Sequence, residues 1–181
     1  MPRMHKRKRR QILKKFRQGE YLTPKEKELL QKAGKEQAFY DKAYFKLARH
    51  QKLIEKIIHH LKNSRILFIE TQLFEERQGI RFIATLFEAL IRHRITFLMY
   101  DVQFHQLDGP EFKHILKLIE HLQKKSLFQI VRAQYVQTDL ELLQTMKDSE
   151  REVVFISKNP FLRIQARQQD QSIFIPDIDN L

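Results

Sequence analysis

Acidic side chains stand beside several apolar runs of this sequence, at places where a parallel sheet would put the ends of its strands. Glu70 and Asp101 each come directly after such a run, and Asp139 opens a helical pattern. Sites in open parallel sheets form at the carboxyl ends of the strands. Carboxylate oxygens suit Mg²⁺ or Mn²⁺, and such an ion can activate water against a phosphodiester. We therefore take Glu70, Asp101 and Asp139 as candidate catalytic residues, with Mg²⁺ or Mn²⁺ as the expected cofactor.

The residue counts exclude several other kinds of site. The 4 glycines form neither a dinucleotide-binding motif nor a P-loop. The absence of cysteine excludes disulfides, thiolate zinc sites and cysteine nucleophiles. No Gly-x-Ser-x-Gly turn is present for a serine hydrolase. The adjacent His59 and His60 diverge on a helix, and His114 with His121 lacks a third ligand, so zinc is not expected.

The first third of the chain is strongly basic. Residues 1–62 contain 19 Lys and Arg against 6 Asp and Glu, a net charge of +13, whereas residues 63–181 contain 15 against 16, a net charge of −1. Such a segment is typical of proteins that bind a polyanion, because each cation placed on a phosphate releases a condensed counterion. An acidic membrane surface would attract the same segment, and a solubilising tail is a further alternative. The candidate nucleic-acid-binding residues are Arg3, Lys6, Arg7, Lys8, Arg9, Arg10, Lys14, Lys15 and Arg17.

Helical patterns follow one another through this basic segment. Residues 1–10 are expected to be disordered until they meet phosphate, because their charges repel. A short amphipathic helix fits residues 11–17. Thr23, with Glu26 three residues later, indicates a capping box that begins the next helix. A third helix with an apolar stripe is expected over about residues 37–62.

Residues 63–181 contain apolar runs that alternate with helical patterns. The runs lie at 65–69, 95–100, 127–133, 152–156 and 172–175, and the helical patterns at 78–93, 111–125, 139–147 and 160–169. This alternation predicts an α/β fold with a three-layer, mainly parallel, Rossmann-like sheet, preceded by the basic helical arm. We expect residues 66–69, 127–131 and 153–156 to be buried, since their continuous apolar runs suit strands covered on both faces. The expected domains are residues 1–62 and 63–181.

The second of these domains resembles the PIN domain of the PIN and NYN nuclease superfamily. Residues 153–166, Val-Val-Phe-Ile-Ser-Lys-Asn-Pro-Phe-Leu-Arg-Ile-Gln-Ala, are similar to the family's strand that leads through a Thr-Asn-Asp-type turn into a Leu-Arg-x-x-Ala helix. Residues 138–143, Thr-Asp-Leu-Glu-Leu-Leu, look like its acidic helix start. Ile69-Glu70-Thr71 occupies the place of its first-strand Asp-Thr. The resemblance covers about residues 64–178.

This resemblance implies the site of an Mg²⁺- or Mn²⁺-dependent ribonuclease, in which three or four acids hold the ion. Carried over position by position, the metal ligands become Glu70, Asp139 and Asn159, while the second family acid falls on Gln106, with Asp101 or Asp108 as substitutes. Two of the four expected carboxylates are therefore amides. An amide ligates through its carbonyl oxygen but adds no negative charge, so metal affinity is expected to fall.

We therefore expect a nucleic-acid-binding protein, with RNA favoured, whose PIN-like domain is catalytically weakened. An active metal-dependent endoribonuclease with a variant acidic site is the alternative, and an assembly subunit of a ribonucleoprotein or homo-oligomer is a further one. No apolar stretch approaches the about 18–20 residues of a membrane span, so no membrane partner is expected. The basic start lacks the apolar core of a signal peptide, and we expect a cytoplasmic protein.

Overall fold

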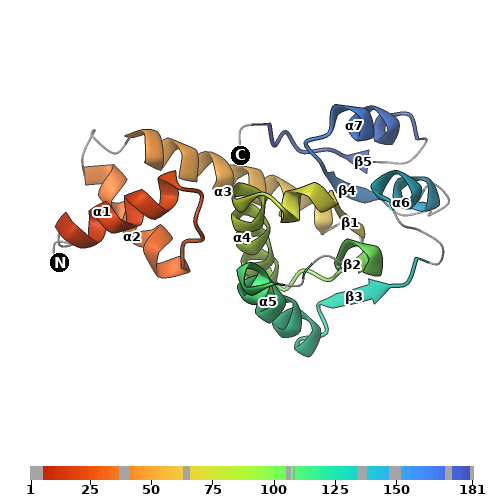
Figure 1. Cartoon of the computed structure of the whole chain (residues 1–181), viewed down its shortest axis with the longest axis horizontal. Coiled ribbons are helices and arrows are strands. Elements are labelled where there is room, and N and C mark those ends of the chain that lie inside the picture. The colour runs from red at the N-terminus through yellow and green to blue at the C-terminus, as the bar shows by residue number, and fades with distance from the viewer. Residues whose placement is uncertain are drawn as a thin grey trace. The chain divides into compact units, whose positions relative to one another are not determined.

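The chain folds into two compact units, residues 1–52 and residues 53–181 (Figure 1). The computed structural model describes residues 6–36, 41–62, 66–104, 107, 109–133, 138–146, 152–169 and 173–179. Helix α3, Asp41–Leu61, contains the boundary between the two units. None of the helices in these ranges combines the length and the apolar character that crossing a bilayer requires.

The first unit contains a helical hairpin made of α1, Lys6–Arg17, and α2, Pro24–Glu36. Ile12, Leu13 and Phe16 of α1 form a small core with Leu22 and Leu30. Helix α1 begins at Lys6, so the prediction of disorder was wrong for residues 6–10. Packing of its apolar face supplies the stability that a short, self-repelling helix lacks on its own.

The predicted capping box at the start of α2 is confirmed. The backbone N–H of Thr23 donates to Glu26 Oε2 at 2.9 Å, and the backbone N–H of Glu26 donates to Thr23 Oγ1 at 3.2 Å. Lys15 of α1 donates through Nζ to Glu26 Oε1 at 2.9 Å. Burial raises the pKa of Glu26, but the hydrogen bonds from Lys15 and Thr23 outweigh it, and the net shift is downward. One carboxylate therefore caps α2 and joins it to α1.

The second unit contains the five-stranded, all-parallel sheet that the sequence predicts. Its strands lie in the order β3-β2-β1-β4-β5. They are β1, Ile66–Ile69; β2, Phe97–Tyr100; β3, Phe128–Val131; β4, Val153–Ile156; and β5, Ile173–Phe174. The helices are α4, Arg77–His93; α5, Lys113–Lys124; α6, Asp139–Met146; and α7, Pro160–Arg167. Short 3₁₀ turns are η2, Thr71–Phe74; η3, Asp101–Phe104; and η4, Pro110–Phe112. The α/β, Rossmann-like fold class is thus confirmed.

Helices cover both faces of this sheet (Figure 1). On one face, Phe68 and Phe155 pack with Leu142 of α6 and Leu162 of α7 in a single buried cluster. On the other face, the ring of Phe97 lies 6.2 Å from that of Phe87 on α4, measured between centroids. Successive residues of a strand point to opposite faces, so the central strands are apolar at every position.

The burial predictions hold for two of the three strands named. All four residues of β1 and all four of β4 are buried. In the run that contains β3, the prediction holds for Leu127 and Phe128 but was wrong from Gln129 onward, where Gln129 is exposed and Ile130 is 39 % exposed. Strand β3 pairs with β2 at one end of the strand order, so its outer side receives less cover than an interior strand.

Candidate functional site

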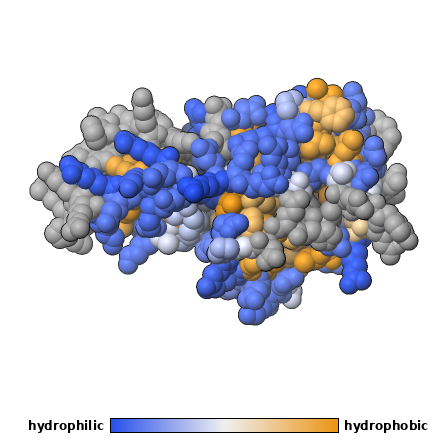
Figure 2. All heavy atoms as spheres, in the orientation of Figure 1, coloured by the Kyte–Doolittle hydropathy of each residue, from blue (hydrophilic) through white to orange (hydrophobic). Residues whose placement is uncertain are grey.

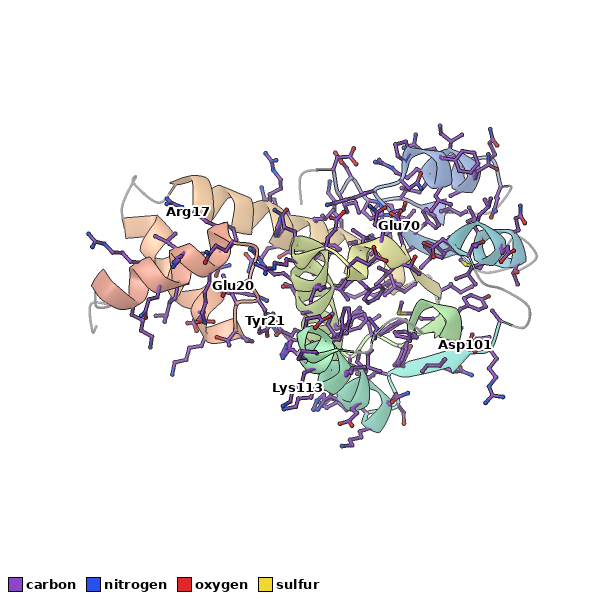
Figure 3. The ribbon with its side chains drawn as sticks, in the orientation of Figure 1. Arg17, Glu20, Tyr21, Glu70, Asp101 and Lys113 are labelled. Carbon is purple, nitrogen blue, oxygen red and sulfur yellow. The ribbon has the colours of Figure 1, made fainter. Side chains whose placement is uncertain are left out.

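Glu70 lies where the chain leaves the central strand of the sheet (Figure 3). From β1 the chain builds β2 and β3 on one side and β4 and β5 on the other, so β1 and β4 flank the point where the strand order reverses. The Glu70 side chain is only 3 % exposed. Its Oε2 accepts hydrogen bonds from Ser157 Oγ at 2.9 Å, the Lys158 backbone N–H at 2.8 Å and the Asn159 backbone N–H at 3.2 Å. The carboxylate therefore holds the chain that leaves β4.

Asp139, the first residue of α6, lies beside the same strand end. Its Oδ2 accepts from the Thr71 backbone N–H and from Thr71 Oγ1, both at 2.9 Å. Burial raises the pKa of Asp139, the two bonds from Thr71 oppose that shift, and the negative charge of Glu70 adds to it. Asp139 Oδ1 is buried and has no hydrogen-bond partner among the described residues. The structure thus places Asp139 against Thr71, the residue that follows Glu70.

Asp101 and Asn159, the remaining candidates, both bond to the backbone. Asp101 Oδ1 accepts from the Ala133 backbone N–H at 3.0 Å, which ties the start of η3 to the residues after β3. Asn159 Oδ1 accepts from the N–H groups of Phe161 and Leu162, at 2.9 and 3.4 Å, and so caps α7. Gln106 and Asp108 lie outside the described residues.

These contacts do not fit a tightly held divalent ion. Within the part of the chain that the structure describes, no three acidic or histidine side chains come together as metal ligands would. Glu70 Oε2 already has three donors and Asn159 Oδ1 has two, whereas Asp139 Oδ1 has none among the described residues. An N–H or O–H group directed at an oxygen occupies the direction from which a cation would approach. The predicted metal set of Glu70, Asp139 and Asn159 is thus arranged as a hydrogen-bonded junction.

Sequence reasoning missed the hydroxyl residues and the ion pair of this junction. Thr71 and Ser157 each donate to one of the two acids, and Ser157 is fully buried. Lys158 Nζ pairs with Glu76 Oε2 at 2.7 Å, just before α4. The two hydroxyl residues could have been predicted, because Thr71 and Ser157 each lie within two residues of a strand end, where an acid of a neighbouring segment was also expected. No local pattern connects Lys158 to a glutamate so far away in the sequence.

The basic candidates are concentrated on α1. Lys8, Arg10, Lys14 and Arg17 are exposed, whereas Lys15 is engaged by Glu26. Figure 2 shows the described surface of α1 and α2 as mostly hydrophilic, and Figure 3 shows the extended side chain of Arg17. Lys6, Arg7 and Arg9 belong to α1, but their side chains, like all of Arg3, lie outside what the structure describes.

Comparisons of the chain with family models, curated proteins and solved structures give no match. The observed sheet order is that of an all-parallel, Rossmann-like α/β domain. The strand order therefore establishes the fold class of the domain, but it does not assign the chain to a family.

Proposed function

We propose that this protein binds nucleic acid through the exposed cations of α1, and that its α/β domain is a scaffold. At the carboxyl ends of its strands, Glu70, Asp101 and Asp139 form what we call the acidic edge, a weakened, PIN-like site. One observation carries the proposal: α1 presents exposed cations while its apolar face is buried in the hairpin core. The helix is thus held in a fixed position with its charges turned to solvent.

The distribution of charge between the two units supports this proposal. Residues 1–52 contain 17 Lys and Arg and 5 Asp and Glu, whereas residues 53–181 contain 17 of each. The whole excess of +12 therefore belongs to the first unit. Polyanion binding needs this concentration of cations on one surface, because affinity arises from the counterions that neighbouring phosphates release. Solubility alone does not require it.

The burial of α1 favours nucleic acid over a membrane surface. A basic amphipathic helix that binds a bilayer inserts its apolar face into the headgroup and acyl boundary. In α1, Ile12 is 2 %, Leu13 7 % and Phe16 6 % exposed, because they pack in the hairpin core. Insertion would require the hairpin to open. Phosphate binding uses only the side that is already exposed.

The acidic edge favours binding over hydrolysis. Glu70 holds the turn after β4, Asn159 caps α7, and Asp101 bonds to Ala133. Asp139 also bonds to a backbone N–H, that of Thr71, so every one of these candidates that the structure describes has a backbone partner. The preference for RNA over DNA rests on the resemblance of residues 64–178 to PIN domains. Ribonuclease activity at a variant site remains the alternative function.

Fluorescence anisotropy with a labelled RNA that contains both stems and loops tests the proposal. Replacing Lys8, Arg10, Lys14 and Arg17 by Ala removes four exposed cations and leaves the buried residues of α1 intact. We expect weaker binding, and a plot of log affinity against log salt whose slope falls by about three to four, because each phosphate contact contributes about 0.7 to 0.9.

A matched variant removes the same number of exposed cations from the second unit, where the expected change is small. Its substitutions are Arg92, Lys113, Lys117 and Lys125 to Ala. Equal losses in the two variants would show that α1 contributes no more to binding than the cations of the second unit, and would contradict the proposal. Absence of affinity for any free RNA would contradict the proposal and leave the assembly-subunit alternative. Tighter binding to anionic vesicles than to RNA would establish a membrane-surface protein.

A further inference from the structure

Three cations of α1 lie in one row along the helix. Arg10, Lys14 and Arg17 follow one another at intervals of four and three residues. Residues with this spacing lie on the same face of a helix. All three are exposed, and no carboxylate among the described residues forms an ion pair with them. Seven residues of rise make the row about 10.5 Å long.

The row is held rigidly by the hairpin behind it. Ile12 and Phe16 are buried against α2, and Lys15, on another side of α1, bonds to the glutamate that caps α2. The backbone positions of the three cations are therefore set before any partner arrives. Such a row suits a partner whose phosphates are also fixed, because only the exposed side chains, and not the backbone of either partner, then lose conformational freedom on binding.

No exposed aromatic ring lies among the described residues of α1. Proteins that bind single strands without sequence preference stack bases on exposed aromatic rings. The one aromatic residue of α1, Phe16, is 6 % exposed and belongs to the core. Tyr21, labelled in Figure 3, is half-buried, and the Lys27 ammonium lies 5.4 Å from the centre of its ring. Contacts at the row are therefore contacts of charge with phosphate.

We infer that the row of Arg10, Lys14 and Arg17 binds the phosphate backbone of double-helical nucleic acid. The neighbouring cations are about 4.5 to 6 Å apart along α1, and one strand of B-DNA carries a phosphate for about 3.4 Å of axis, so each cation of the row can contact a different phosphate. The partner is recognised by its fixed phosphate array and not by its bases, so binding is independent of sequence. This inference rests on the proposed function of α1 and specifies its partner.

The test compares double and single strands of the same length on the full chain. Labelled RNA and DNA duplexes of about 20 base pairs, and their separate strands, are titrated between about 50 and 200 mM salt. We expect one or both duplexes to bind more tightly than either single strand, and the two duplex arms identify which helix is preferred. For the duplexes, the triple variant Arg10→Ala, Lys14→Ala, Arg17→Ala should have a slope of log affinity against log salt that is about 2.7 smaller than that of the wild type. Between about 50 and 200 mM salt, the affinity of the variant should therefore fall by a factor about 40 times smaller than the factor for the wild type.

Two control variants separate charge from structure. Exchanging the cations, as Arg10→Lys, Lys14→Arg, Arg17→Lys, should keep the wild-type slope because the charge is unchanged. Replacing Lys113, Lys117 and Lys125 by Ala should also keep it. Single strands that bind as tightly as the duplexes, or a triple variant with an unchanged slope, would overturn the inference while leaving nucleic-acid binding itself intact. Failure of every nucleic acid to bind at the lowest salt would overturn both.

Discussion

Glu70 connects two segments that are distant in the sequence. Its buried oxygen receives the Ser157 hydroxyl and two backbone N–H groups of the turn that leads into α7. A buried acceptor with three donors is well satisfied, so this acid is a structural contact of the strand end. A carboxylate at a sheet edge is therefore not diagnostic of a metal site, since the same position can be occupied by a residue that joins β1 to β4.

The carboxyl of Asp139 makes the stability of the domain depend on pH. Burial, reinforced by the charge of Glu70 and opposed by Thr71, raises the pKa of Asp139 above its ordinary 3.8. The folded protein therefore binds the Asp139 proton more tightly than the unfolded chain does. The stability that this proton contributes is fully present below the pKa of the unfolded chain, and it is lost as the pH rises through the pKa of the folded protein. An amide at this position does not ionise. We expect Asp139→Asn to gain stability relative to the wild type between about pH 3 and 7, measured as the free energy of urea unfolding at each pH.

Asp139→Ala is the control for this effect. Asparagine keeps an oxygen that can accept from the N–H and hydroxyl of Thr71, whereas alanine removes the acceptor. The alanine variant should therefore lose stability relative to the wild type across this pH range, because the Thr71 donors are left without their partner. A difference between Asp139→Asn and wild type that does not change with pH would contradict the proposed ionisation of this carboxyl.

At the scale of elements, Gly79 sets how closely α4 approaches the end of η2. A Cβ added at Gly79 would lie 2.0 Å from the carbonyl oxygen of Leu73, which belongs to the backbone. The backbone must therefore shift if any side chain is introduced. We expect Gly79→Ala to lower the free energy of unfolding by about 1–3 kcal/mol, despite the higher helix propensity of alanine. Urea unfolding of the full chain measures the change.

Gly109 provides the matched comparison. There an added Cβ would meet the carboxylate of Glu111 at 2.7 Å, the far end of an exposed and flexible side chain. That side chain can turn away, so Gly109→Ala should change stability by less than about 0.5 kcal/mol. Equal effects of the two substitutions would show that the contact between Gly79 and Leu73 does not limit the approach of α4 to η2.

The elements that the sequence predicted well are those whose pattern is local. The parallel strands and the helices between them are visible as apolar runs and helical periodicity, and the observed bounds lie within a few residues of those expected. Two features were not local. The exposure of Ile130 depends on the position of β3 at one end of the strand order, and the helical state of residues 6–10 depends on packing of α1 against α2. The helix and strand propensities of the residues alone predict neither of these two features.

The candidate site was predictable in its positions but not in its contacts. The rule that sites lie at carboxyl strand ends identified Glu70 and Asp139, and the structure places Asp139 in hydrogen-bond contact with Thr71, the next residue after Glu70. The same rule could not tell that Asn159 Oδ1 would cap α7, or that Asp101 would bond to Ala133. Those partners are backbone groups, and no residue type in the sequence marks them.

At the scale of the whole molecule, the excess positive charge and the candidate acidic residues Glu70 and Asp139 belong to different units. The excess charge lies in residues 1–52, and the junction of Glu70 and Asp139 lies in residues 53–181, whose Lys and Arg equal their Asp and Glu in number. Binding through α1 and hydrolysis at the acidic edge can therefore be altered separately. This separation allows the two candidate functions to be distinguished in one set of variants.

We expect the full chain to show no Mg²⁺- or Mn²⁺-dependent cleavage of single- or double-stranded RNA, because donors already occupy Glu70 Oε2 and Asn159 Oδ1. The variant Glu70→Gln, Asp139→Asn should bind RNA with wild-type affinity, since α1 is unchanged. Labelled RNA resolved on a denaturing gel measures cleavage, and anisotropy on the same samples measures binding. Circular dichroism establishes that the variant is folded. Cleavage by the wild type that disappears in the folded variant would establish a variant nuclease site and refute the scaffold interpretation, whereas loss of binding in that variant would place part of the nucleic-acid surface at the acidic edge.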